Sequence, residues 1–327
     1  MFSANAVTAG VPGQNWIAKS GPNRAYEDGA YGNGIYLYLA NNAYLATSTD
    51  ANTWTESTAM RSATLSNTRS IVYSSGLNGF FVGSETSVVY SFDNGASWTR
   101  VSISGMSTMS AMISGGSTVV GYDSGGNVAT STNGTTWTNR GNMTTLAGWG
   151  SGAYSGEPYG GAYGNGLFML VGFNVSPSIY STCATSPDGV TWTNRPGLNT
   201  AVSSSSSTMR IVAWCPTLGK WFAGGFSAST LGGIIAYSED NGANWTVSSG
   251  ATSLLSGLGG SVKWITEVNG TIVAMAGTNT IITSTDGVNW KAQTGLATIG
   301  VSTDSYMQNG GILVVAQANS TKLAVSV

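Results

Sequence analysis

The segment Ser186-Pro187-Asp188-Gly189-Val190-Thr191-Trp192 is one of six copies of a short phrase in this chain of 327 residues. The other copies occupy residues 48–54, 91–98, 131–137, 238–245 and 284–290. Asp-Gly and Asn-Gly between β-forming residues favour tight hairpins, because both central residues need a positive φ. Each copy therefore predicts a turn between two strands. The Trp follows at the start of the second strand, where it can pack across the hairpin.

The copies follow one another at intervals of roughly 40–50 residues, which is typical of propellers and similar repeat arrays. A second hairpin precedes each copy, and one such stretch, Ala30-Tyr31-Gly32-Asn33-Gly34, recurs at residues 162–166. The runs around these hairpins are rich in Val, Ile, Tyr, Phe and Trp, as strands are. Each unit therefore predicts four short antiparallel strands, A to D.

The seventh unit, which starts at Ser305, stops at Val327 before its strand D. The N-terminal segment 14–19 supplies a candidate, because Trp16 stands where every other strand D has its Trp. We expect the first and last strands to pair in one blade, since closing the ring leaves only short, protected edges. The predicted fold is all-β: a single seven-bladed β-propeller over residues 11–327, preceded by an N-terminal arm, residues 1–10.

The repeated phrase resembles the Asp-box, or bacterial neuraminidase repeat, and the resemblance covers nearly the whole chain. The Asp-box occurs in sialidases, other glycosidases, sorting receptors, photosystem assembly factors and virus tail proteins, and this chain looks most like propeller proteins of bacteriophage virions. The first copy has Ala51 in place of Gly and the third has Asn in place of Asp, departures that a relaxed turn tolerates. The resemblance implies a propeller architecture but says almost nothing about catalytic activity or ligand.

The acidic position of the phrase has two interpretations, turn scaffolding and metal or ligand binding. We favour scaffolding, because Asp, Asn and Gly are the residues that such turns demand. The residues concerned are Asp50, Asp93, Asn133, Asp188, Asp240 and Asp286. With no His and no Cys-x-x-Cys, we predict no metal site and no cofactor. Cys183 and Cys215 are best interpreted as free thiols packed as small apolar side chains, and whether they pair stays open.

Charged residues make up 8% of the chain, and the net charge is −2. No Lys/Arg run exists, so we expect no nucleic-acid partner. No apolar stretch reaches membrane-spanning length, so we expect no membrane insertion. Ser, Thr, Gly and Asn fill the surface, as in extracellular β-proteins and virus fibres, and the N-terminus lacks the marks of a secretory signal. We therefore expect a virion or extracellular protein that is made in the host cytoplasm.

The D–A and B–C connections surround the channel mouth, on the face opposite the repeated turns. The longest D–A connection, residues 140–161, and the B–C connection of the same unit, residues 172–181, carry aromatic residues amid Gly, Asn and Ser. Aromatic faces and amides suit a sugar, whereas the alternative is that these aromatics pin long loops onto the blades. The candidate ligand-binding residues are Trp149, Tyr154, Glu157, Tyr159, Phe173, Asn174 and Tyr180.

Basic residues stand at the predicted starts of A strands, where their heads could converge on a carboxylate or phosphate. The candidates for ligand binding among them are Arg24, Arg69 and Arg210. Sialidases use an arginine triad with a Tyr/Glu pair and an Asp acid, and this chain has Tyr306, Glu27 and Asp28 available. The Arg-Ile-Pro signature of the first sialidase arginine is absent, however, and the triad spacing does not match. We therefore assign no catalytic residue.

The predicted function is that of a non-catalytic virion surface protein, associated with the tail or capsid of a bacteriophage. Its partners would be other virion proteins, a host receptor or a host-surface glycan. Two alternatives remain: a glycan-processing enzyme of the sialidase-like type, and a secreted carbohydrate-binding lectin. An acidic pair facing a cleft would favour the enzyme, and a flat face covered by another subunit would favour a structural role.

Overall fold

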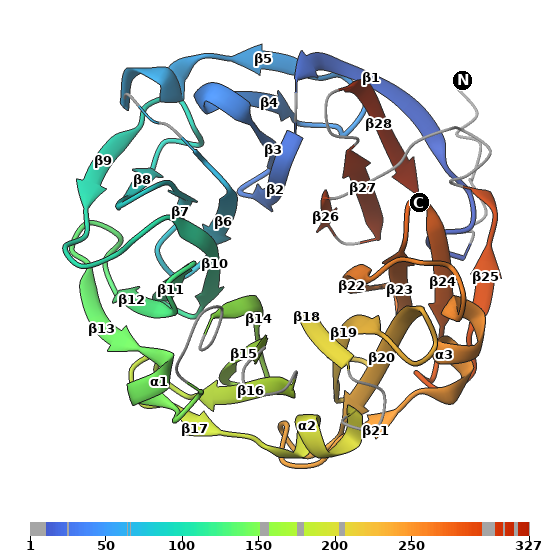
Figure 1. Ribbon diagram of the computed structural model, residues 1–327. Coiled ribbons are helices and arrows are strands. Elements are labelled where there is room, and N and C mark those ends of the chain that lie inside the picture. The colour runs from blue at the N-terminus through green and yellow to red at the C-terminus, as the bar shows by residue number, and fades with distance from the viewer. Residues whose placement is uncertain are drawn as a thin grey trace, which may run out of the picture.

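The computed structural model describes residues 11–24, 26–63, 65, 67–150, 157–174, 180–202, 207–295, 305–309, 311–316 and 320–326. Their strands form seven four-stranded antiparallel sheets. The sheets stand as blades around a central axis (Figure 1). The structure is therefore the seven-bladed β-propeller that the sequence predicts. The predicted N-terminal arm, residues 1–10, lies outside the described residues.

Each blade runs from its innermost strand A to its outermost strand D. Blade 1 comprises β2 (Tyr26–Gly32), β3 (Ile35–Ala40), β4 (Tyr44–Ser48) and β5 (Thr55–Ser57). Blade 2 comprises β6 (Ser70–Ser74), β7 (Gly79–Gly83), β8 (Ser87–Ser91) and β9 (Thr99–Ser102). Blade 3 comprises β10 (Met109–Gly115), β11 (Thr118–Asp123), β12 (Asn127–Ser131) and β13 (Thr138–Asn142). Blades 4 and 5 comprise β14 (Pro158–Gly164), β15 (Leu167–Asn174), β16 (Tyr180–Ser186) and β17 (Thr193–Asn194); and β18 (Ser207–Cys215), β19 (Lys220–Ser227), β20 (Gly232–Ser238) and β21 (Thr246–Val247).

Blade 6 comprises β22 (Val262–Val268), β23 (Thr271–Ala276), β24 (Thr280–Ser284) and β25 (Lys291–Gln293). Blade 7 comprises β26 (Ser305–Asn309), β27 (Ile312–Ala316), β28 (Ser320–Ser326) and, from the other end of the chain, β1 (Ile17–Arg24). Short helices lie in the connections: η1 (Asn41–Ala43), η2 (Ala59–Ala63), α1 (Met143–Leu146), α2 (Gly197–Val202) and α3 (Ser249–Leu255). No helix of the described residues is long and apolar enough to cross a membrane.

The core lies between the blades rather than in one central mass. Each of its seven clusters packs one sheet against the next, as Phe222 of blade 5 does against Ile272 of blade 6. The ends of some A strands approach the next blade so closely that only glycine fits: a Cβ on Gly32 would lie 2.0 Å from the ring of Tyr73. The two cysteines are free and buried in two different clusters.

The six repeated phrases form one structure, which we call the tryptophan turn. In the copy at 186–192, the Ser186 hydroxyl donates to Asp188 at 2.9 Å, and the same Asp188 oxygen accepts the backbone N–H of Val190 and of Thr191, each at 2.8 Å. Gly189 has a φ of +75°, and its carbonyl accepts the indole N–H of Trp192 at 3.1 Å. All of these contacts lie within seven residues, so the sequence alone is enough to predict the turn.

The ring closes as predicted, because β1 pairs antiparallel with β28, with Lys19 opposite Leu323. The ends of the chain also assemble a seventh tryptophan turn. Ser326 accepts the N–H of Gly13 at 2.9 Å, and the Gly13 carbonyl accepts the indole N–H of Trp16 at 2.8 Å. Gly13 has a φ of +81°. These are the Ser, Gly and Trp of the other turns, supplied here by two ends of the chain.

Candidate functional site

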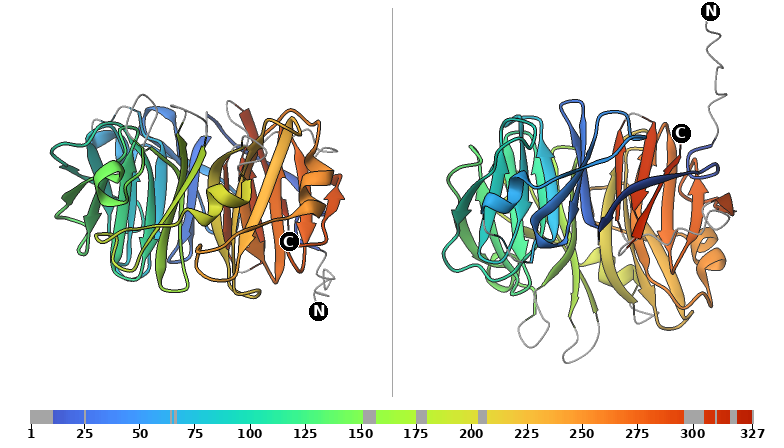
Figure 2. Two further views of the ribbon diagram at one scale, coloured as in Figure 1. Left: turned by 60° about the horizontal axis from the view of Figure 1, so that its bottom comes forward. Right: turned by 90° about the horizontal axis from the view of Figure 1, so that it is seen from above.

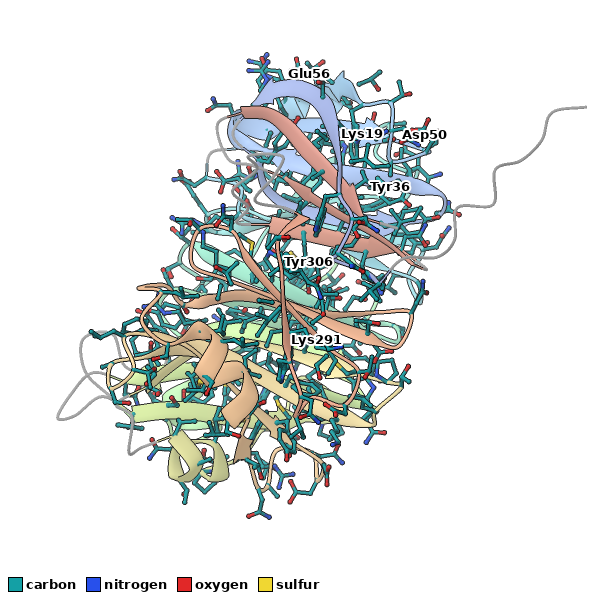
Figure 3. The ribbon with its side chains drawn as sticks, turned by 90° about the vertical axis from the view of Figure 1, so that its right-hand side faces the viewer. Lys19, Tyr36, Asp50, Glu56, Lys291 and Tyr306 are labelled. Atoms are coloured by element: carbon teal, nitrogen blue, oxygen red, sulfur yellow. The ribbon has the colours of Figure 1, made fainter. Side chains whose placement is uncertain are left out.

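The ring has two faces, one at each end of its strands (Figure 2). In an antiparallel blade the A–B hairpin and the C–D turn lie at the same end. Asn33 of an A–B hairpin accordingly donates to Asn94 of the neighbouring tryptophan turn at 2.8 Å. We call this end the turn face, and Figure 3 labels Asp50 on it. The opposite end, where the B–C and D–A connections gather, we call the loop face.

A repeated irregularity marks the start of the innermost strand. In five blades the register between strands A and B shifts by one residue near the loop face, leaving one residue of strand A unpaired as a β-bulge. Such bulges re-aim a side chain and recur beside binding sites. We call these positions the bulge ring: Glu27, Ser110, Tyr159, Arg210 and Lys263. Sequence reasoning named Glu27, Tyr159 and Arg210 one by one but not their shared geometry, because a bulge depends on the partner strand.

The members of the bulge ring differ chemically, whereas the structural positions of the repeat do not. Ser and Trp recur in every tryptophan turn, because each has the same bonds to make. The ring carries a carboxylate, a hydroxyl, a phenol and two cations, of which Glu27, Tyr159 and Arg210 are exposed. Positions that share a backbone geometry but not a side-chain type are not constrained by the fold, so their side chains are free to differ from blade to blade.

Two members of the ring meet at the channel mouth. The rings of Tyr159 and Phe173 stack with centroids 4.5 Å apart, and the Arg210 guanidinium carbon lies 5.6 and 5.3 Å from these centroids. Tyr159 is 38% exposed and Phe173 is 6% exposed. Burial raises the pKa of Glu157, although the Tyr159 hydroxyl donates to its carboxylate. The structure thus joins four of the predicted candidates, and we call Tyr159, Phe173 and Arg210 the mouth cluster.

Other predicted candidates lie close together but are buried. Trp149 is 4% exposed and packs between blades 3 and 4, and Asn174 is fully buried. Trp149 and the half-buried Tyr180 line a small cavity of about 110 Å³. Trp149 therefore fits the alternative interpretation, in which an aromatic side chain packs onto the blades instead of facing a ligand. Tyr154 lies outside the described residues.

The three candidate arginines do not converge. Arg24 ends the outermost strand of blade 7 and forms a bidentate ion pair with Glu56, at 2.7 and 3.0 Å. Figure 3 shows Glu56 at the rim, away from Tyr306 on the innermost strand of its blade. Arg69 precedes β6 and is exposed, and only Arg210 reaches the mouth cluster. The predicted convergence is wrong because Arg24 belongs to an outermost strand rather than to the start of an innermost one.

The channel is a cavity of about 470 Å³, lined mainly by A strands. Asp28 supplies the one carboxylate among the described residues that line it. Most glycosidases use two carboxyl groups flanking the scissile bond, whereas sialidases use a tyrosine nucleophile. Burial raises the pKa of Tyr306 to about 12, with a smaller effect from Asp28, and its hydroxyl donates to the Ile265 carbonyl at 3.2 Å. This shift is opposite to the one that would activate a phenol as a nucleophile.

The acidic residues of the tryptophan turns are committed to backbone contacts. The Ser97 side chain and backbone, together with Ser91, lower the pKa of Asp93 to about 2. The other five copies of the phrase repeat this arrangement, with the amide oxygen of Asn133 in the third copy, and the described residues contain no group of three or more potential metal ligands among His, Cys, Asp and Glu. The carboxylate oxygens therefore serve the turns, in keeping with the scaffolding interpretation.

No family model matches the chain, and no curated protein matches its sequence. Among solved structures it is similar to YCF48 bound to D1 peptide, with 16% identity, a TM-score of 0.70 and coverage of 97% of this chain and 98% of that one. It is also similar to YCF48 from Cyanidioschyzon merolae, with 13% identity, a TM-score of 0.69 and coverage of 95% and 98%.

A third similar structure is the extracellular domain of the putative one component system BT4673 from B. thetaiotaomicron. Its identity is 10% and its TM-score 0.66, with coverage of 96% of this chain and 40% of that one. Identities this low speak for architecture and not for chemistry. The comparisons and the strand topology agree on one conclusion: the chain is a seven-bladed β-propeller.

Proposed function

We propose that this chain is a non-catalytic binding propeller that holds a segment of a partner protein across the channel mouth on its loop face. The observation that carries the proposal is the bulge ring, which presents different side chains from equivalent positions around one opening. Tyr and Arg are the residue types that dominate binding energy at protein interfaces, and Tyr159 and Arg210 stand at the centre of this face. Arg210 has no carboxylate partner among the described residues.

The comparisons support a peptide ligand by analogy. A similar structure is YCF48 bound to D1 peptide, so a fold of this kind accepts a peptide. For the setting, we propose a virion surface, with another virion protein or a host-surface receptor as the partner. That part of the proposal is supported by the sparse charge and the Ser, Thr, Gly and Asn content of the chain. A host glycan on the same face is the competing ligand.

A photo-cross-linking pair tests the proposal. Tyr159 and Tyr163 lie on the same strand, and each is 38% exposed, but Tyr159 lies at the loop face and Tyr163 toward the turn face. Replacing each with p-benzoylphenylalanine in the native particle gives a matched pair. We expect residue 159, and not residue 163, to cross-link one discrete protein. Equal cross-linking from both positions, or from neither, would show that the loop face is not the interface.

Tyr159→Ala should weaken binding of the cross-linked partner by about 1–3 kcal/mol, the usual loss of an aromatic anchor. Tyr163→Ala should leave the affinity unchanged, as measured by calorimetry with the purified partner. A glycan array on the same proteins tests the competing ligand. If a glycan binds the wild type but not Tyr159→Ala, and no protein is cross-linked, the ligand is a sugar and not a partner protein.

A further inference from the structure

A second pocket lies on the loop face, at the rim of blade 1 and apart from the mouth cluster. It has a volume of about 430 Å³. Its lining comes from three segments: the end of β1, η1 with the first residue of β4, and η2 with the residues just after it. The lining residues are Arg24, Asn42, Ala43, Tyr44, Arg61 and Leu65. None of them belongs to the bulge ring.

One tyrosine holds two guanidinium groups in this pocket. The guanidinium carbon of Arg24 lies 3.5 Å from the centroid of the Tyr44 ring, and that of Arg61 lies 4.8 Å from it. Arg61 also donates from Nη1 to the Tyr44 hydroxyl at 2.9 Å. A planar guanidinium over an aromatic ring is a favourable and orienting contact. We call Arg24, Tyr44 and Arg61 the arginine clamp.

The charges of the clamp do not balance. Arg24 uses Nε and Nη2 to hold both oxygens of Glu56, and this pair raises the pKa of Arg24 and lowers that of Glu56. Arg61 forms no ion pair among the described residues, although its charge adds to the lowering of the Glu56 pKa, and the Tyr44 hydroxyl accepts only from its Nη1. Arg24 holds its carboxylate with Nε and Nη2. The same two donors of Arg61 can therefore accommodate another acceptor.

The backbone beside the clamp is held in an unusual conformation. Asn42 and Ala43 both have positive φ, at +58° and +61°, and neither is glycine. Ala43 is only 2% exposed. Consecutive left-handed residues without glycine carry strain, which persists only where surrounding contacts enforce it and which often marks ligand sites. The strained pair lines the pocket between the two arginines and so belongs to the same site.

We propose that the arginine clamp binds the carboxylate of an acidic side chain on a partner protein. The surplus positive charge and the unused fork of Arg61 select an anion with two parallel oxygens. A sugar acid is disfavoured, because Arg24 already covers the Tyr44 ring on which a pyranose would stack. The proposal shares with the proposed function only the premise that the partner is a protein.

The test measures binding of a fluorescein-labelled tetraglutamate peptide by anisotropy at low salt. Arg61→Gln should weaken this binding about tenfold, and Arg61→Lys should recover only part of the loss, because a lysine lacks the fork. Arg69→Gln is the matched control, since it removes one positive charge from an exposed arginine on the same face. It should change the affinity less than about twofold, as expected for screened charges at a distance. A tetraglutamine peptide should not bind.

Three results would overturn the proposal: equal losses with Arg61→Gln and Arg69→Gln, full recovery with Arg61→Lys, or stronger competition by glucuronate than by N-acetylglutamate amide. The melting temperature of Arg61→Gln should match the wild type, because Arg61 is exposed and has one hydrogen bond. Tyr159→Ala should not change tetraglutamate affinity. If Tyr159→Ala weakened tetraglutamate binding and Arg61→Gln did not, the peptide carboxylates would bind at the channel mouth. That result would contradict the arginine clamp and leave the proposed function intact.

Discussion

Asp28 shows how strongly neighbours determine the behaviour of a single residue in this ring. Its carboxylate lies on the channel wall and accepts the backbone N–H of Gly29 at 2.8 Å and of Ile71, in the next blade, at 3.0 Å. Ser70 extends the link by accepting the N–H of Met112, in the third blade, at 3.2 Å. Burial nevertheless raises the pKa of Asp28 to about 6, since loss of solvation outweighs these bonds.

The raised pKa predicts a specific dependence of stability on pH. In the unfolded chain this carboxyl titrates near 3.8, so between about pH 4 and pH 6 the folded protein binds the extra proton. The contribution of Asp28 to the free energy of unfolding is therefore fully present below about pH 4 and is lost as the pH rises through about 6. Relative to Asp28→Asn, the wild type should lose about 3 kcal/mol of unfolding free energy between about pH 3 and pH 7. Urea denaturation at several pH values measures this difference, and parallel curves for the two proteins would refute the prediction.

The tryptophan turn is the element that repeats, and its Trp serves the fold. Trp98 is 7% exposed, packs in the cluster between blades 1 and 2, and donates its indole N–H to the Gly95 carbonyl at 3.0 Å. Its burial joins two blades, whereas its hydrogen bond closes one turn. The two contributions can be separated by substitution.

Trp98→Ala should lower the free energy of unfolding by about 3–5 kcal/mol, because it leaves a cavity between two sheets. Trp98→Phe should cost only about 1–2 kcal/mol, since it keeps most of the apolar contact and loses the hydrogen bond. Denaturant titration gives both values, and binding at the loop face should persist in whatever protein folds. A Trp98→Ala protein of native stability that had lost its ligand would make this Trp a binding residue instead.

The whole molecule depends on the joint between its two ends. The pairing of β1 with β28 and the split tryptophan turn both draw on residues 12–24 and 320–326. Position by position, Ser326, Gly13 and Trp16 match Ser186, Gly189 and Trp192 once Pro12 is placed at the Asp position. The joint therefore closes the ring at the point where an uninterrupted chain would carry its seventh copy.

Deleting residues 1–19 should expose the edge of β28 and cause aggregation or loss of cooperative unfolding. Deleting residues 1–10 is the matched control, because every closure contact described above begins at Pro12 or later, and this shorter protein should melt like the full chain. Scanning calorimetry and light scattering distinguish the two. A protein lacking residues 1–19 that stayed monomeric and melted like the control would show that the joint is dispensable.

The sequence alone determined the blades, their number and the closure of the ring. The blades are recognised from contacts within seven or eight residues, such as that of Ser186 with Asp188. The closure is inferred because each end of the chain lacks the strand that the other end supplies. The tertiary structure decided the surface on which the proposals rest. The bulges that expose Tyr159 and Arg210 arise from register against a neighbouring strand, and the burial of Trp149 arises from packing between two blades. The pairing of Arg24 with Glu56, on which the proposed role of Arg61 depends, joins strands of different blades. None of these contacts has a local pattern, because each depends on how separate blades meet.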